Sequence, residues 1–196
     1  SSAASDVYKR QVLASPEQQS IYQYLVENYQ VTYVAGGAAQ NTARCAQYAL
    51  PDGSTAYLGS VGRDDLAQQL RAANDREGLQ SVYQIVDGTP TGSCAVVITD
   101  HNRSLCTNLG AAEKFDKSHL DSSEAKAAIE AAKFFYIGGF FLTHGVESAL
   151  VVAKHAKENN KVRFMILSDS AICIQPFGAF YSAILQVPGG PGSPVR

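Results

Sequence analysis

Residues 31–41 read VTYVAGGAAQN, an apolar run that leads into two glycines, small residues and an amide pair. The pattern predicts a strand over 31–35, a tight turn and a helix over 41–50. Gly36 and Gly37 permit a positive φ and let a ligand approach the main chain closely. The N–H groups that open the helix favour an oxygen-rich ligand, and Gln40 and Asn41 add side-chain donors and acceptors. An ordinary strand-to-helix turn explains the same residues, so the assignment of a site here depends on other motifs.

Helices and strands alternate along the rest of the chain at the spacing of βαβ units. Periodic apolar residues predict helices over 15–28, 64–77, 125–132, 147–159 and 177–185, and apolar runs predict strands over 55–61, 81–86, 134–137 and 162–167. The run at 134–137 is continuous, which favours a strand buried on both faces. The alternation indicates an α/β fold with a mainly parallel sheet. The inward-facing residues expected on the first two helices are Ile21, Leu25, Val26, Ala43, Ala46 and Leu50.

Two extended runs, 93–99 and 104–109, interrupt the alternation. The residues that join them, Asp-His-Asn-Arg at 100–103, have the composition of a hairpin turn. We expect this hairpin to lie outside the main sheet as a small lid, together with the segment 31–35.

The two ends of the chain differ in composition from the part between them. Residues 1–11 carry no clear period, and we expect them to be disordered or foreign to the domain. Residues 187–196 are rich in proline and glycine and are also expected to be disordered. One domain is therefore predicted over 12–186.

Composition excludes several classes of partner. The net charge is −2 and no basic block occurs, so we expect neither nucleic acid nor a membrane surface as a partner. The four cysteines, at 45, 94, 106 and 173, fit neither a zinc site nor a disulfide framework. We expect the thiols to be reduced and the protein to be cytoplasmic, with a nuclear location also open. We also expect a monomer, and no metal-ligating residue in this chain.

Four stretches carry small or polar residues that a plain core does not need: VAGGAAQN at 34–41, PTGSCA at 90–95, NRSL at 102–105 and YIGGFFLT at 136–143. Together, over about residues 12–167, they resemble the ribokinase-like (PfkB) carbohydrate kinases, and within that family the branch that phosphorylates adenosine. The resemblance implies a three-layer α/β/α fold with a mainly parallel sheet and a small β lid. It also implies transfer of phosphate from ATP, with Mg²⁺, to the 5′-hydroxyl of adenosine, which serves purine salvage.

The resemblance assigns roles to nine residues. Gly37 and Asn41 would hold the ribose hydroxyls, with Gln40 at the border of the same pocket. Phe140 would stack on the base, and Arg103 would stabilise the transferring phosphate. The lid residues that would line the nucleoside pocket are Cys94, Leu105, Thr107 and Leu109.

Two motifs of the family are not found in this chain: the Gly-Ala-Gly-Asp that supplies the catalytic base, and the Asn-x-x-Glu that organises Mg²⁺. We therefore expect a truncated kinase that is inactive by itself. Another nucleoside or sugar kinase of the family, or a non-catalytic nucleoside-binding module, are the alternatives. The apolar Leu105, Leu109 and Phe140 favour a base over a bare sugar. A dinucleotide-binding domain is disfavoured because no G-x-G-x-x-G follows a predicted strand.

A sheet that lacks part of its strands exposes an unpaired edge and apolar helix faces. We therefore predict that the 196-residue chain is marginally stable and tends to aggregate when expressed alone. Thermal unfolding followed by circular dichroism, together with size-exclusion chromatography, checks this. A sharp, cooperative transition of a monomeric chain would contradict the prediction.

Overall fold

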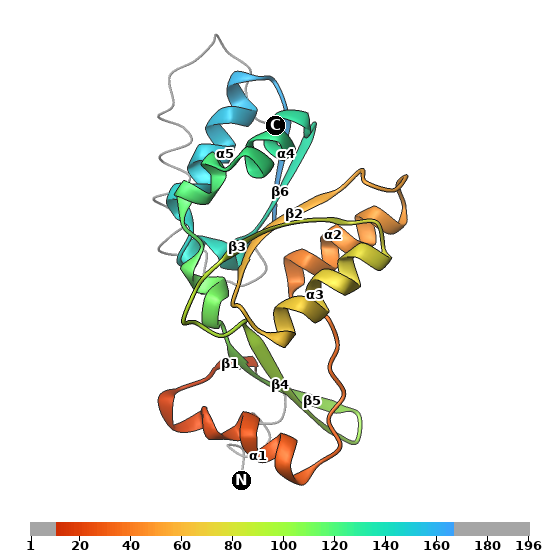
Figure 1. Ribbon diagram of the computed structural model, residues 1–196, viewed down its shortest axis with the longest axis vertical. Helices are drawn as coiled ribbons and strands as arrows, with labels where there is room; N and C mark the ends of the chain where they lie inside the picture. The colour runs from red at the N-terminus through yellow and green to blue at the C-terminus, as the bar shows by residue number, and fades with distance from the viewer. Residues whose placement is uncertain (1–10, 167–196) are drawn as a thin grey trace. The chain divides into compact units, whose positions relative to one another are not determined.

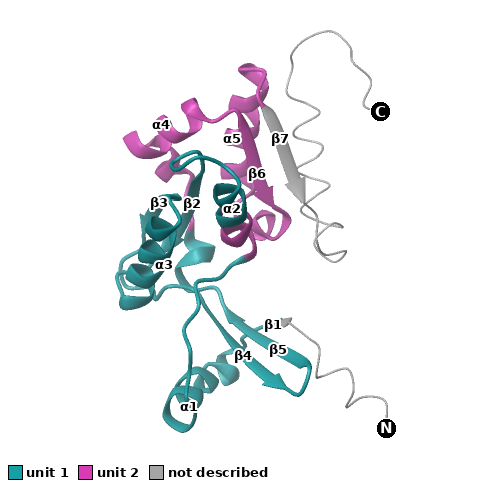
Figure 2. Ribbon diagram, turned by 90° about the vertical axis from the view of Figure 1, so that its right-hand side faces the viewer, with its two compact units in different colours: residues 1–37, 44–114 teal, residues 38–43, 115–196 magenta. Residues whose placement is uncertain are grey.

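The computed structural model describes residues 11–166, and within β7 only the backbone (Figure 1). The predicted helix at 177–185 and the predicted tail at 187–196 lie outside the described residues. The chain divides into two compact units (Figure 2). Unit 1 contains residues up to 37 and residues 44–114, and unit 2 contains residues 38–43 and everything from 115 onward. Gln11, which was expected to belong to a disordered leader, begins a strand instead, and residues 1–10 lie outside the described residues.

A parallel βαβ element forms the centre of unit 1. Strand β2 (Ala56–Val61) pairs in parallel with β3 (Gln80–Ile85), and helix α3 (Asp65–Arg76) connects them, as predicted. Asp64 caps α3 through a hydrogen bond from the backbone N–H of Ala67, and Gly78 ends it with a φ of +70°. The core of this element consists of Val61, Ala67 and Tyr83, against which Tyr57 and Leu70 pack.

Helix α2 (Ala38–Tyr48) begins three residues earlier than predicted, and its buried face is polar. Ala46 and Leu50 are exposed, contrary to the prediction, whereas Gln47 is only 1% exposed. The Gln47 side chain donates to the Pro51 carbonyl at 2.8 Å and accepts from the Thr55 N–H at 2.9 Å. These bonds satisfy backbone groups of the loop into β2, which explains why an amide is buried where the pattern predicted apolar residues.

Arg44 of α2 pairs with Glu77, which follows the end of α3. Its guanidinium makes a bidentate pair with Glu77, with Nε at 2.7 Å from Oε2, and Nη1 donates to the Ala35 carbonyl at 3.2 Å. Hydrogen bonds from Arg44 hold the pKa of Glu77 below its ordinary value. The segment before Gly36 is thus held by a side chain rather than by a sheet.

The predicted strand at 31–35 does not form. Val31, Tyr33 and Val34 are 41%, 58% and 82% exposed and belong to no ladder. An extended run becomes a strand only where another strand pairs with it, and none of the described strands pairs with this run. The apolar run therefore stays a connecting segment.

The lid is a three-stranded sheet in the order β1-β5-β4. Strands β4 (Ser93–Thr99) and β5 (Asn102–Asn108) form the predicted antiparallel hairpin, and β1 (Gln11–Leu13) adds in parallel to β5. The turn is Asp100-His101, two residues rather than the predicted four, and Asp100 has a φ of +54°. A short 3-10 turn η2 (Pro16–Gln18) and helix α1 (Ser20–Asn28) follow β1, and Val26 is exposed instead of inward.

Unit 2 pairs β6 (Phe134–Gly138) in parallel with β7 (Val162–Ile166), connected by helix α5 (Val146–Glu158). Leu142 and Ala149 form its core with Ile137 and Phe141. The 3-10 turns η4 (Lys117–Asp121) and η5 (Gly139–Thr143) and helix α4 (Ser123–Ala131) complete it.

Strand β6 was predicted to be buried on both faces, but one of its faces is exposed. Phe134 and Tyr136 are 65% and 38% exposed, because α5 covers only the face that carries Ile137. The continuous apolar run therefore predicted the strand correctly, but the prediction that both of its faces are buried was wrong.

Asn74 of α3 provides a test of the buried polar contacts in unit 1. Its amide is fully buried and donates to Ser81 Oγ at 2.9 Å and to the Tyr83 hydroxyl at 3.0 Å, so Asn74→Ala leaves both hydroxyls without this donor. We expect the free energy of unfolding to fall by about 1–3 kcal/mol. Urea denaturation measures it, with Gln68→Ala on the exposed side of the same helix as the control. Equal stability of the two variants would contradict the prediction.

Candidate functional site

The glycine pair opens α2 in the way that its position in the sequence suggested. Gly37 is the N-cap residue and has a φ of 100° and a ψ of 125°, a conformation that residues with a side chain rarely adopt. Gln40 and Asn41 therefore lie in the first turn of the helix rather than before it. Asn41 is exposed, whereas Gln40 is 3% exposed and belongs to the interior of unit 2.

The first turn of α2 lies beside the end of β6 within unit 2. A Cβ built on Gly138 would be 3.6 Å from the Cβ of Ala39, so small residues on both elements permit the approach. Phe140 follows two residues later in η5, is 38% exposed, and makes an edge contact with His144 at 6.4 Å between ring centroids. Three of the predicted residues, Gln40, Asn41 and Phe140, are thus in the same unit.

The pairing of β4 with β5 decides which lid side chains share a face. Cys94 is opposite Thr107, and the Thr107 hydroxyl donates to Cys94 Sγ at 3.2 Å. Leu105 and Arg103 follow at alternate positions of β5 and therefore lie on the same face. The structure brings together four of the lid residues to which the resemblance assigned roles.

Two further residues on this face were missed from the sequence. Val96 is opposite Leu105 and Ile98 is opposite Arg103, and they are 49% and 72% exposed. The alternation of β4 carried the signal, but it becomes usable only once the register of the hairpin is known. The lid therefore presents a continuous apolar surface, which we call the lid face: Cys94, Val96, Ile98, Leu105 and Thr107.

Arg103 and Leu109 lie at the two ends of β5. Arg103 is an exposed strand residue beside the turn, rather than part of the turn as predicted. Leu109 comes after the last residue of β5, is half-buried, and accepts a hydrogen bond at its carbonyl from the Ala112 N–H at 2.9 Å. Both belong to unit 1 with the rest of the lid.

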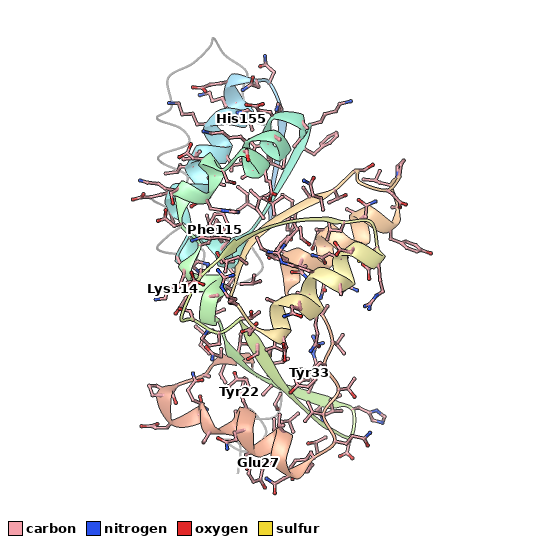
Figure 3. All side chains as sticks on the ribbon, in the orientation of Figure 1. Tyr22, Glu27, Tyr33, Lys114, Phe115 and His155 are labelled. Carbon is pink, nitrogen blue, oxygen red and sulfur yellow. The ribbon has the colours of Figure 1, made fainter. Side chains whose placement is uncertain are left out.

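The opposite face of the lid is buried at Ala95 and Cys106 and exposed at Val97. Ala95 is opposite Cys106, and they are 7% and 9% exposed. Tyr22 of α1 donates its hydroxyl to the Cys106 carbonyl at 2.8 Å (Figure 3). Burial, with a smaller effect of Cys106, raises the pKa of Tyr22 to about 12, so the hydroxyl stays a donor to higher pH than that of a free tyrosine. The lid thus has one face that α1 partly covers and one apolar face that is more exposed.

Residues 12–161, whose side chains are described, contain no group of three His, Cys, Asp or Glu residues that could hold a metal ion. In the same part of the chain, none of the helices has both the length and the apolar character that crossing a membrane requires.

Residues 10–185 match the pfkB family carbohydrate kinase, and the chain belongs to this family. The structure is similar to that of Anopheles gambiae adenosine kinase in complex with P1,P4-di(adenosine-5) tetraphosphate, with a TM-score of 0.82 and 37% identity over 91% of this chain and 55% of that chain. The adenosine kinase from Schistosoma mansoni in complex with adenosine gives a TM-score of 0.82 at 26% identity, over 93% and 55%. The ribokinase-like α/β fold with a mainly parallel sheet and a small lid is confirmed.

Sequence relatives are adenosine kinases. That of Schizophyllum commune is 49% identical over 176 residues, which are 90% of this chain and 50% of that protein. That of Schizosaccharomyces pombe is 48% identical over 159 residues, 80% and 46% of the two chains. The chain spans about half the length of the curated relatives it matches, and the resemblance to the adenosine-phosphorylating branch is confirmed.

Tyr22→Phe removes the hydrogen bond from α1 to the lid. We expect the free energy of unfolding to fall by about 1 kcal/mol, and Tyr24→Phe, on an exposed part of the same helix, to have no effect. Because the pKa is raised from 10.0, this stabilisation is complete below pH 10 and is lost as the pH rises toward about 12. Denaturant unfolding at pH 7 and pH 11 measures both effects. An equal loss in both variants would contradict the assignment.

Proposed function

We propose that this chain is the nucleoside-binding part of an adenosine kinase, which transfers a phosphoryl group from ATP to the 5′-hydroxyl of adenosine and gives AMP and ADP. The observation that carries the proposal is the lid face, an open apolar surface on one side of a three-stranded sheet. A flat purine gains binding free energy from apolar contact and stacking, whereas a bare sugar does not. The identity of up to 49% to adenosine kinases agrees with this substrate.

The ribose end of the nucleoside requires different partners. A vicinal diol needs neutral groups that both donate and accept, and an exposed amide side chain does both. Asn41 supplies this amide in the first turn of α2, and Gly37 lets the diol approach the backbone. In this proposal Gln40 supports Asn41 from the interior of unit 2, and Phe140, partly exposed, stacks on the base.

Phosphoryl transfer depends on positioning and on stabilisation of charge. Arg103, exposed beside the lid turn, supplies a guanidinium for the transferring group. ATP is the proposed donor, with Mg²⁺, which proteins usually bind through one or two carboxylates together with the phosphates of the nucleotide. The described residues contain no group of three His, Cys, Asp or Glu side chains that could hold the ion by themselves. The proton of the 5′-hydroxyl needs a general base, and the family motif that carries it is absent from this chain. A cytoplasmic location and a monomeric state are part of the same proposal.

Isothermal titration of the chain with adenosine, inosine and ribose tests the proposed substrate. We expect heat of binding with adenosine, weaker binding of inosine and none of ribose, because only the nucleosides present a base to the lid face. A coupled assay of ADP release is expected to show no turnover. Binding of ribose that is as tight as binding of adenosine would favour a sugar kinase, and adenosine-dependent turnover would contradict the missing base.

Val96 and Val97 form a matched pair, adjacent on β4 and exposed by 49% and 41%, but on opposite faces of the lid. We expect Val96→Asp to weaken adenosine binding at least tenfold, since a carboxylate on the lid face must lose water beside the base. We expect Val97→Asp to leave the affinity within a factor of two. The Kd values from the same titration decide, and equal effects of the two substitutions would show that the nucleoside does not use the lid face.

A further inference from the structure

The segments that enter and leave the lid hairpin lie against each other at two glycines, where there is no room for a side chain. A Cβ on Gly92, immediately before β4, would lie 2.6 Å from the Leu109 carbonyl oxygen, which follows β5. A Cβ on Gly110 would lie 2.3 Å from the Pro90 carbonyl oxygen. The Ala111 N–H donates to that same carbonyl at 2.8 Å. The chain therefore enters and leaves the lid through two segments in direct backbone contact, which we call the lid base: residues 90–92 and 109–111.

A carboxylate outside the lid holds the lid base. Asp64, at the start of α3, accepts from the Thr91 N–H at 2.7 Å and from the Thr91 hydroxyl at 2.6 Å. The Thr91 hydroxyl in turn accepts from the Gly62 N–H at 2.9 Å. Gly62 has no room for a side chain, because a Cβ there would lie 2.9 Å from the Thr91 nitrogen. The end of β2, the start of α3 and the lid base are thus joined through Thr91.

Asp64 accepts more hydrogen bonds than the capping of α3 requires. The Ala67 N–H at 2.9 Å from Asp64 Oδ1 already satisfies the cap of α3. The two additional bonds go to Thr91, which is 3% exposed. Burial acts to raise the pKa of Asp64, but the hydrogen bonds from Thr91 and Ala67 outweigh it and hold the pKa below its ordinary value. The ionised carboxylate is therefore the form that these contacts favour, and charge-assisted bonds are stronger than neutral ones.

Because of the position of Thr91 in the chain, its contact with Asp64 affects the orientation of the lid face. Thr91 precedes Cys94 by three residues, and β4 sets the register of the hairpin through its pairs with β5. A small rotation at the lid base moves every residue of the lid face together, since the strands are hydrogen-bonded along their full length. Fixing one residue at the base therefore orients Cys94, Leu105 and Thr107 as a group.

We propose that Asp64 is a positioning residue that orients the lid face toward the nucleoside by holding Thr91 at the lid base. The part of this inference that concerns the nucleoside rests on the proposed function; the anchoring of the lid does not. Nothing in the resemblance assigned a role to either residue.

Hydrogen–deuterium exchange measured by mass spectrometry on the whole chain tests the anchoring. Asp64→Ser retains a capping oxygen for α3 but is too short to reach Thr91, and Thr91→Val keeps the side-chain volume without the hydroxyl. We expect both substitutions to speed exchange in peptides covering 92–111 roughly tenfold and to leave α3 unchanged, as the loss of a charge-assisted hydrogen bond implies. Thr91→Ser, which restores the hydroxyl, is expected to exchange like the unsubstituted chain.

Asp116 offers a matched control, because it caps η4 in unit 2 through the Ser118 N–H at 2.8 Å, whereas the lid belongs to unit 1. Asp116→Ser should leave exchange in the lid unaltered. If Thr91→Val leaves exchange at 92–111 unchanged, or if Asp64→Ser speeds exchange in α3 as much as in the lid, Asp64 is only a helix cap and the proposal is wrong. Thr91→Val decides alone should Asp64→Ser prevent folding.

Adenosine titration of the same variants separates the two proposals. We expect Thr91→Val to raise the Kd for adenosine roughly tenfold, as misorientation of the lid face predicts, and Thr91→Ser to restore it. Failure of the unsubstituted chain to bind adenosine would overturn the proposed function, while the exchange result would still decide the anchoring. An unchanged Kd in Thr91→Val, with faster lid exchange, would overturn the link between anchor and nucleoside.

Discussion

Close backbone contact at Gly92 and Gly110 is the constraint on which the lid depends. At both positions a side chain would collide with a carbonyl oxygen of the opposite segment, at 2.6 and 2.3 Å. Because the two segments touch, strands β4 and β5 leave the rest of unit 1 at one place and can pair along their whole length. The lid face follows from this pairing, since cross-strand neighbours point to the same side of a sheet.

Glycines also determine the backbone geometry at the start of α2 and the end of β6, the other part of the candidate site. Gly37 has a φ of 100° and begins α2, while Gly138 lets Ala39 approach the end of β6. In both cases a glycine sets the backbone geometry and a polar side chain lies close by: Asn41 after Gly37, and Thr91 with Asp64 beside Gly62 and Gly92. This explains why the motifs that carry the resemblance combine glycines with small polar residues.

Buried polar contacts join elements of unit 1 outside its small apolar core. Gln47 closes the loop into β2, Asn74 bonds two hydroxyls of β3, and Asp64 joins α3 to the lid base. Each satisfies groups that would otherwise lose hydrogen bonds on burial. In the sequence these residues look like surface positions of amphipathic helices, and the apolar periodicity predicted the wrong inward face for α2 for that reason.

The sequence by itself determined the alternation of helices and strands, the hairpin, the caps of α3 and the family, because these depend on local periodicity, turn chemistry and motifs. Only the tertiary structure decided that residues 31–35 form no strand, because an extended run becomes a strand only where the fold brings a pairing strand beside it. It also placed Val96 and Ile98 on the lid face, since the face of a strand residue is known only with its register. The anchoring of Thr91 by Asp64, 27 residues away in the chain, is likewise a product of folding that local sequence does not encode.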